Sequence, residues 1–238
     1  NVMAMNQKNS RRSMLVDMER EYEGYAKGVK GIMNAYQKGK VGQAHIHGPL
    51  AQLIRTDKEY ITAIDTALGA AGQNIVTQSE EDAKMAIGYL RDQRMGRATF
   101  LPITAIRSRS FDARQAKSSS GFIAVAADLV RCDEQYRAIV SNFLGSTVIC
   151  DNLDHAVSMA KKAGHKFRIV TLDGDVIQAG GAMTGGSAIK TTGSLSRTGE
   201  IESLGQELRG LRQTITQEEE QLRLHIGRRE MLIAQLKD

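Results

Sequence analysis

The sequence predicts a mixed α/β globular domain made of two similar halves and flanked by helices that form an antiparallel coiled coil. Three observations predict it: an internal repeat in the middle of the chain, alternating strands and helices in each half, and apolar heptads near both ends. The chain has 238 residues, of which 41% are hydrophobic and 25% charged. That length is enough to bury a sizeable core.

The internal repeat supports the two-half architecture most directly. Residues 53–60 (LIRTDKEY) resemble residues 129–136 (LVRCDEQY) without a gap. Leu68-Gly69 and Leu144-Gly145 match at the same distance along the chain as residues 53 and 129. In each half a short strand then precedes a helix, and a second strand follows. The expected strands are 75–76, 98–101, 148–149 and 168–171, and the helices start at Ser79 and Asp151. This order predicts two subdomains related by a pseudo-twofold axis.

Two aspartates occupy the same place in the repeat. Asp57 and Asp133 stand where helices that end at Gly69 and Gly145 should begin. Aspartate is a favoured N-cap residue, and glycine often follows the last turn of a helix. We therefore expect both aspartates to be helix caps rather than catalytic acids.

The ends of the chain carry apolar residues at intervals of three and four, the pattern of a coiled-coil seam. These residues are Ile201, Leu204, Leu208, Leu211 and Ile215 near the C-terminus, and Leu15, Met18, Tyr22 and Tyr25 near the N-terminus. Two such stripes predict an antiparallel hairpin of two helical arms. The chain begins with Asn1 rather than Met, so we expect a piece of a longer protein.

Composition suggests where the segments meet. The polar, serine-rich stretch around residues 107–120 is typical of a linker. The expected segments are an N-terminal arm at 1–26, a first subdomain at 27–106, the linker at 107–120, a second subdomain at 121–192 and a C-terminal arm at 193–238.

The region from Phe167 to Ser187 combines a β-branched run, a tight Asp173-Gly174-Asp175 turn and a cluster of glycines. Glycine has no Cβ, so such a surface admits either a phosphate group or a second backbone. A P-loop needs glycine directly before its lysine and another five residues earlier. Ile189 and Thr184 occupy those places, which disfavours nucleotide binding.

The charge pattern permits contact with a polyanion. The net charge is +5, and lysines gather in two places along the middle of the chain. The candidates for sequence-independent phosphate contacts are Lys27, Lys30, Lys38, Lys40, Lys161, Lys162 and Lys190. Further basic residues beside these clusters are Arg168 and Arg197.

Signals for enzyme chemistry are weak. His45 and His47 would share one face of a strand, but no cysteine or carboxylate stands beside them, so a structural pair is favoured over a metal site. Cys132 and Cys150 look unpaired, as expected in a reducing cytoplasm. The sequence also lacks an apolar run near the ~20 residues of a membrane span. We expect neither a catalytic site nor a bound metal or cofactor.

Together these features resemble the hinge of an SMC (structural maintenance of chromosomes) protein, in its bacterial, homodimeric branch. The resemblance covers about residues 25–187 and the flanking arms. It rests on Gly28–Ile32, His47–Leu50, Gly96–Pro102 and the glycine-rich run Gly180–Ser187.

The resemblance implies a dimerisation module that joins two coiled-coil arms, with DNA contacts near the junction of hinge and coil. Its dimer contact would include Gly180, Gly181, Met183, Gly185 and Gly186. ATP and Mg²⁺ would bind to head domains of the longer parent, outside this chain. The parent would be cytoplasmic, associated with the nucleoid, and joined by kleisin-type subunits.

Two alternatives to the dimerisation module stay open. In the first, the chain is mainly a sequence-nonspecific DNA-binding module whose dimerisation is incidental. In the second, it is an enzyme that handles phosphate with the glycine-rich loop. Nucleotide should then raise its melting temperature.

Overall fold

The structure, a computed structural model, describes residues 2–186 and 193–235 and divides into two compact units. A globular unit spans Glu19–Gly199, and an arm unit combines residues up to Met18 with residues from Glu200 onward. Lys190, one of the predicted phosphate contacts, lies outside the described residues.

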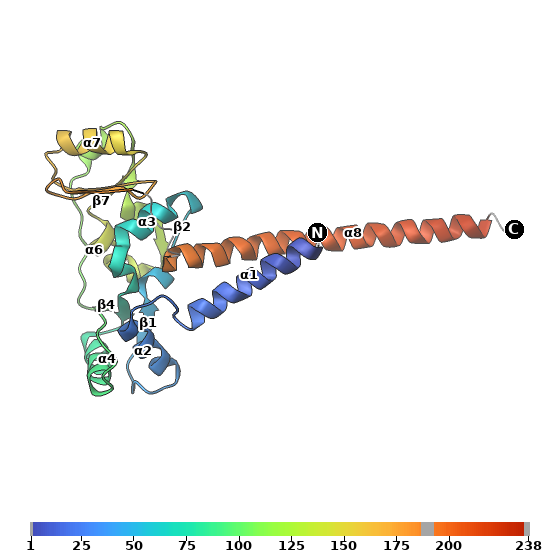
Figure 1. Cartoon of the computed structure of the whole chain (residues 1–238), viewed down its shortest axis with the longest axis horizontal. Helices are drawn as coiled ribbons and strands as arrows, with labels where there is room; N and C mark the ends of the chain where they lie inside the picture. The colour runs from blue at the N-terminus through green and yellow to red at the C-terminus, as the bar shows by residue number, and fades with distance from the viewer. Residues whose placement is uncertain (1, 187–192, 236–238) are drawn as a thin grey trace. The chain divides into compact units, whose positions relative to one another are not determined.

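The described helices and strands alternate along the chain as expected (Figure 1). The helices are α1 (Val2–Arg20), α2 (Lys27–Gln37), α3 (Ile61–Leu68), α4 (Glu80–Asp92), α5 (Arg114–Lys117), α6 (Arg137–Leu144), α7 (Leu153–Lys162) and α8 (Ser194–Gln235). The strands are β1 (Ile46–Pro49), β2 (Ile54–Thr56), β3 (Ile75–Thr77), β4 (Phe100–Pro102), β5 (Phe122–Val125), β6 (Val130–Cys132), β7 (Thr147–Cys150), β8 (Arg168–Thr171), β9 (Val176–Ile177) and β10 (Met183–Thr184).

The two halves of the globular unit share one topology. The first sheet has the order β1-β3-β4 and the second β10-β9-β8-β7-β5. In the first half β3 pairs antiparallel with β1 and parallel with β4. In the second half β7 likewise pairs antiparallel with β5 and parallel with β8. The predicted mixed α/β architecture is confirmed. The second half differs by two added strands, β9 and β10.

A pseudo-twofold axis passes between the halves where β2 pairs with β6. Arg55 pairs with Arg131, its own counterpart in the repeat, while Ile54 pairs with Cys132 and Thr56 with Val130. A strand that pairs with its own copy in this symmetric register requires a twofold axis through the central pair. The repeat seen in the sequence is therefore a symmetry of the fold.

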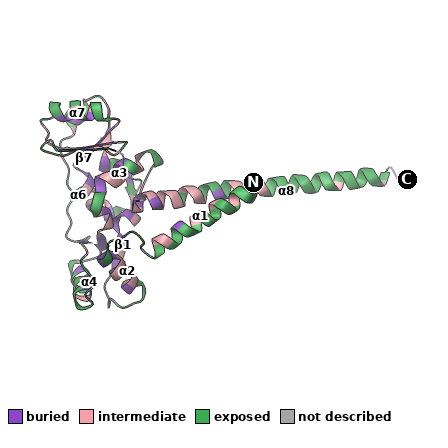
Figure 2. Cartoon of the chain, viewed as in Figure 1, coloured by how far each residue is buried: buried purple, intermediate pink, exposed green. Residues whose placement is uncertain are grey.

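The largest core lies between the two halves and is built from matching residues of both (Figure 2). From the first half it takes Leu50, Ile54, Ala63, Ile64 and Leu68, and from the second Ala126, Val130, Ile139, Val140 and Leu144. Since the halves bury these side chains against each other, neither half has this core alone. This shared burial explains why the globular unit is one compact body.

In the arm unit, α1 and α8 pack as an antiparallel pair. One ion pair joins Lys8 to Glu207, and a second joins Arg11 to Glu200 at 2.9 Å. Going from Lys8 to Arg11 along α1, the partner residue moves back along α8 from Glu207 to Glu200, so the two helices run in opposite directions. Leu15 and Leu208 are buried in the seam, as the heptads predict.

The N-terminal apolar stripe was predicted to continue through Tyr25, but α1 ends at Arg20. Tyr22 takes a left-handed conformation at φ +52°, which ends the helical path. Its ring packs edge-on against Tyr25, with centroids 5.6 Å apart, and both tyrosines join the core beneath α2.

The segment predicted as a linker is packed against the second half. Ser141 Oγ donates to the Arg109 carbonyl at 2.8 Å, and Asn142 Nδ2 donates to the Arg107 carbonyl at 2.7 Å. Phe111 stacks on Phe167 with ring centroids 5.0 Å apart. The segment boundaries stay a prediction, but this stretch is held along its length and contains α5.

The predicted helix caps hold in part. Ser79 caps α4 through a reciprocal box with Asp82, and the Ser79 hydrogen bond lowers the pKa of the Asp82 carboxyl. The N-cap of α7 is Asn152 instead of Asp151. Asp57 precedes a 3-10 helix and makes no capping bond; its carboxylate accepts a bond from Arg131 instead, at 2.8 Å.

Asp133, the counterpart of Asp57, likewise precedes a 3-10 helix without a capping bond. The sequence placed both aspartates at the correct turn. A carboxylate at an N-cap position still needs a free N–H within reach, and neighbouring groups decide that.

Replacing Ser79 by Ala should lower the free energy of unfolding by ~1 kcal/mol, because the N–H of Asp82 loses its acceptor. Urea denaturation followed by far-UV circular dichroism measures it. Asp57→Ala is the matched control and should cost less than ~0.5 kcal/mol, since it removes only an exposed ion pair. Equal losses would refute this account of the caps.

Candidate functional site

Strand β10 forms one edge of the five-stranded sheet. Met183 pairs with Ile177 and Thr184 with Val176, so β9 covers one side of β10. Among the described residues no strand covers the other side. Met183 is 55% exposed on this edge. An uncovered edge offers free N–H and C=O groups to a second strand.

The glycines predicted at the dimer contact surround β10. Gly180 and Gly181 form the turn into it with φ of +92° and +98°, and Gly186 follows it with φ +123°. Side chains rarely adopt such angles, so each of these positions favours glycine within its own chain. The turn is further held by Gly180 N–H, which donates to the His165 carbonyl at 2.9 Å.

A second exposed apolar area lies on the first half, which the sequence reasoning missed. A groove of about 560 Å³ runs between α4 and β4, and β4 is an edge of the three-stranded sheet. Its apolar lining includes Ala83, Ile87, Ala98, Phe100 and Pro102. Ile87 is 42% exposed there. The mixed spacing of these residues along α4 and β4 carried no recognisable signal.

The predicted DNA-contact lysines form two separate groups. Lys27 and Lys30 lie on α2, with Lys38 and Lys40 just beyond it; Lys161 and Lys162 lie in the last turn of α7. All but the half-buried Lys30 are exposed. In Figure 1, α2 and α7 occupy opposite ends of the globular unit. The two groups therefore do not form one continuous basic surface.

Two arginines that the sequence placed beside these clusters turn inward. Arg168 donates to the carbonyls of Ala67 and Thr66, at 2.7 and 3.1 Å, at the C-terminal end of α3. Its burial lowers the pKa of the Arg168 guanidinium. Arg197 is only 4% exposed and pairs with Glu19. Both arginines serve the fold and are not available to phosphate.

Glu19 and Arg197 connect the last turn of α1 to the first turn of α8. Arg197 Nη1 lies 3.4 Å from Glu19 Oε2 and donates to the Glu23 carbonyl at 2.8 Å. Gln52 Nε2 donates to the other Glu19 oxygen at 2.7 Å. The roots of both arm helices are thus tied to each other and to the globular core.

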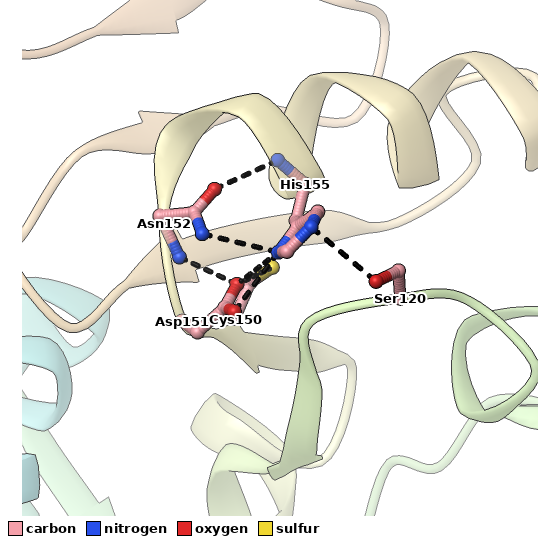
Figure 3. A network of polar contacts seen from close by, with 5 residues as sticks. All are labelled: Ser120, Cys150, Asp151, Asn152 and His155. Atoms are coloured by element: carbon pink, nitrogen blue, oxygen red, sulfur yellow. Dashed lines mark hydrogen bonds and ion pairs between the residues drawn. The ribbon is translucent and has the colours of Figure 1, made fainter.

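A polar network at the start of α7 has the order of a catalytic triad (Figure 3). His155 Nδ1 lies 2.8 Å from Asp151 Oδ1, and His155 Nε2 lies 3.3 Å from Ser120 Oγ. The hydrogen bond between His155 and Asp151 lowers the pKa of the Asp151 carboxyl. A hydroxyl, an imidazole and a carboxylate in that order can activate a nucleophile.

This network surrounds the N-cap of α7, where Asn152 Oδ1 accepts the His155 N–H at 2.9 Å. The first half has a related link: Asp82, the third residue of α4, accepts from the His45 N–H at 2.8 Å, just before β1. His155 is the third residue of α7 and reaches Ser120, just before β5. A link between the start of the helix and the first strand is therefore made in both halves, through different groups.

His47, the other histidine of the predicted pair, has hydrogen-bond partners in both halves, and neither cysteine forms a disulfide. His47 forms two hydrogen bonds, between Nδ1 and the Tyr136 hydroxyl at 2.9 Å and between Nε2 and Gln78 Oε1 at 3.1 Å. The bond with Tyr136 connects the two halves. Cys132 and Cys150 are free, and burial raises the pKa of the Cys150 thiol to about 11.

Among the described residues, no helix is long and apolar enough to cross a membrane. Within the same residues, no three His, Cys, Asp or Glu side chains gather to hold a metal ion.

Comparisons with known proteins agree with this fold. A family model described as "SMC proteins Flexible Hinge Domain" matches residues 43–160. The crystal structure of an asymmetric dimer of the Geobacillus stearothermophilus SMC hinge domain is 38% identical, with a TM-score of 0.80 over 90% of this chain and 86% of that chain. The chain belongs to the SMC hinge family.

Other SMC proteins show the same relationship. The Chromosome partition protein Smc of Bacillus subtilis (strain 168) is 42% identical over 206 residues, which is 85% of this chain and 17% of that protein. The Pyrococcus furiosus Smc hinge domain with an extended coiled coil is 29% identical, with a TM-score of 0.58 over 89% of this chain and 84% of that chain. This SMC hinge thus spans about a sixth of the length of the curated relatives it matches.

Proposed function

We propose that this SMC hinge joins two copies of a longer Smc protein by pairing the edge of β10 with a second copy. The observation that supports this most is a sheet edge that no other described strand covers and that carries a 55% exposed methionine, Met183. A partner strand would complete the backbone hydrogen bonds of that edge and remove the methionine from water. The Geobacillus stearothermophilus hinge was crystallised as a dimer, in agreement with this proposal.

The groove beside β4 suggests where the β10 edge binds. The large hydrophobic residues most exposed on the globular unit are Met85, Ile87, Leu153 and Met183. If β10 of one copy meets the groove of the other, a twofold axis repeats the contact with the roles exchanged. Two equal contacts then close the dimer, and neither edge is left free to add further copies.

Light scattering over a range of concentrations tests the proposed dimer. The expected result is a stable mass of about twice 26.0 kDa. A monomer at every concentration would contradict the proposal and favour the alternative, a DNA-binding module.

Contact with DNA is a second, weaker part of the proposal. The exposed lysines on α2 and at the end of α7 offer phosphate contacts without base recognition. Because they lie at opposite ends of the globular unit, each group would bind separately (Figure 1). No base-reading motif accompanies them, so sequence-independent binding with strong salt dependence is the expected behaviour.

Charge reversal of Lys161 and Lys162 to Glu should weaken binding to duplex DNA about tenfold at low salt. Each lost phosphate contact should also reduce the slope of log affinity against log salt by ~0.9. Fluorescence anisotropy measures both quantities. Lys58→Glu, an exposed lysine outside both groups, is the control and should leave the slope unchanged. Unaltered binding by the double variant would assign the contact elsewhere.

The wider role follows from the relatives that are named chromosome partition proteins. We place this hinge in a cytoplasmic, nucleoid-associated Smc protein that takes part in chromosome partition with kleisin-type subunits. ATP and Mg²⁺ would bind to head domains outside this chain, so the hinge itself would have no catalytic role.

A further inference from the structure

Asp175 directly precedes β9 and lies beside the glycines that follow β10. Val176 pairs with Val170 on one side and with Thr184 on the other. The next row across these three strands therefore contains Thr171, Asp175 and Gly185. Asp175 N–H donates to Thr171 Oγ1 at 2.9 Å, and its carbonyl accepts the Thr171 N–H at 2.9 Å. The backbone of Asp175 is thus held firmly by β8.

The carboxylate of Asp175 extends from this position toward the far end of β10. Gly186 N–H donates to Asp175 Oδ1 at 3.4 Å. A Cβ added to Gly185 would lie only 2.3 Å from the same oxygen. Gly185 has no positive φ to account for its glycine, unlike Gly180, Gly181 and Gly186. The contact with the carboxylate is the one constraint on it that the described residues contain.

We infer that Asp175 positions β10 for the partner chain, and that Gly185 is glycine because of this carboxylate rather than because the partner approaches it. The inference rests on the proposed dimer. Strand β10 has two residues and two ladder pairs, so a further anchor at its end keeps the edge in line with the sheet. A displaced edge would present its N–H and C=O groups in the wrong register.

A double-mutant cycle of Asp175→Ala and Gly185→Ala separates the two explanations for Gly185. Alone, Gly185→Ala should raise the dimer dissociation constant about fivefold, since its Cβ would displace the carboxylate oxygen from the Gly186 N–H. Asp175→Ala should also raise it about fivefold, because no carboxylate then accepts the Gly186 N–H or the Thr171 hydroxyl. With the carboxyl group gone, the nearest atom still present would be the Cβ of residue 175, at an ordinary 3.6 Å. The double variant should therefore be no worse than Asp175→Ala.

The measurement is the dimer dissociation constant from sedimentation equilibrium of the full chain. If the two effects multiply, to about twenty-fivefold in the double variant, Gly185 serves the partner and the inference is overturned. Asp175→Asn keeps an oxygen acceptor of the same shape and should stay within about twofold of the original protein. If Asp175→Asn behaves as Asp175→Ala does, the positioning role is wrong.

Amide hydrogen exchange at Gly186 gives a readout that does not depend on the dimer. Its N–H should exchange faster in Asp175→Ala and in Gly185→Ala, and no faster in the double variant than in Asp175→Ala. If the unsubstituted protein is a monomer, the proposed function is refuted, but the same exchange pattern is still expected because the contact lies within one chain. Unchanged exchange in Asp175→Ala would refute the inference while the dimer could still stand.

Discussion

Replacing Met183 by Lys should convert the dimer into a folded monomer. Met183 is 55% exposed on β10, so its side chain is not part of the buried core. In the proposed dimer a lysine there would bring an ammonium group against Ile87 and Phe100. The groove already contains the cations Lys84 and Arg91, so this contact is unfavourable. We expect the dissociation constant to rise at least ~hundredfold, or ~3 kcal/mol. Light scattering across concentrations measures it.

Met183 offers a cleaner test than the glycines around it. Three of those glycines have positive φ and the fourth touches Asp175, so larger residues there would disturb β10 itself. Leu153→Lys on α7 is the matched control, an exposed apolar residue away from the edge, and should stay dimeric. A dimeric Met183→Lys would remove β10 from the interface.

The same assay distinguishes two arrangements of the dimer. Ile87→Lys, in the groove between α4 and β4, should also give a monomer if β10 of one copy binds the groove of the other. If Ile87→Lys stays dimeric while Met183→Lys is monomeric, the two β10 edges pair with each other instead.

Replacing Arg197 by Met should lower the free energy of unfolding of the globular unit by about 2–3 kcal/mol. Arg197 is 4% exposed, and its loss leaves the largely buried Glu19 without its ion-pair partner. Removing one member of a buried pair typically costs 3–5 kcal/mol. The expected loss is smaller because Glu19 keeps the hydrogen bond from Gln52. Thermal and urea denaturation at fixed protein concentration measure the change.

Arg11→Met provides the comparison for this variant. Arg11 pairs with Glu200 at 2.9 Å, but both side chains are substantially exposed. An exposed pair contributes ~0–1 kcal/mol, so Arg11→Met should change stability little. Equal losses in the two variants would show that burial does not distinguish them. The larger loss expected for Arg197 would identify the root of the arms as a stabilising part of the fold.

The sequence alone determined the architecture, because its signals are local or periodic. The match of residues 53–60 to 129–136 predicted two equivalent halves, and the pairing of Arg55 with Arg131 confirms that they are related by a twofold axis. The heptads predicted the antiparallel arms, and the cap at Ser79 followed from residue type and position. Each of these depends on neighbours within a few residues or on a repeat that is visible in the chain.

Only the tertiary structure decided how the candidate site is built. It showed that no described strand covers the outer side of β10 and that Gly185 lies against Asp175, which depends on strand order and register. It also showed that Arg168 and Arg197 turn inward, although Lys161 and Lys162 on α7 stay exposed. A cluster of charges or glycines in the sequence does not reveal which members face solvent. That is decided by which strands and helices pack against them, and these come from distant parts of the chain.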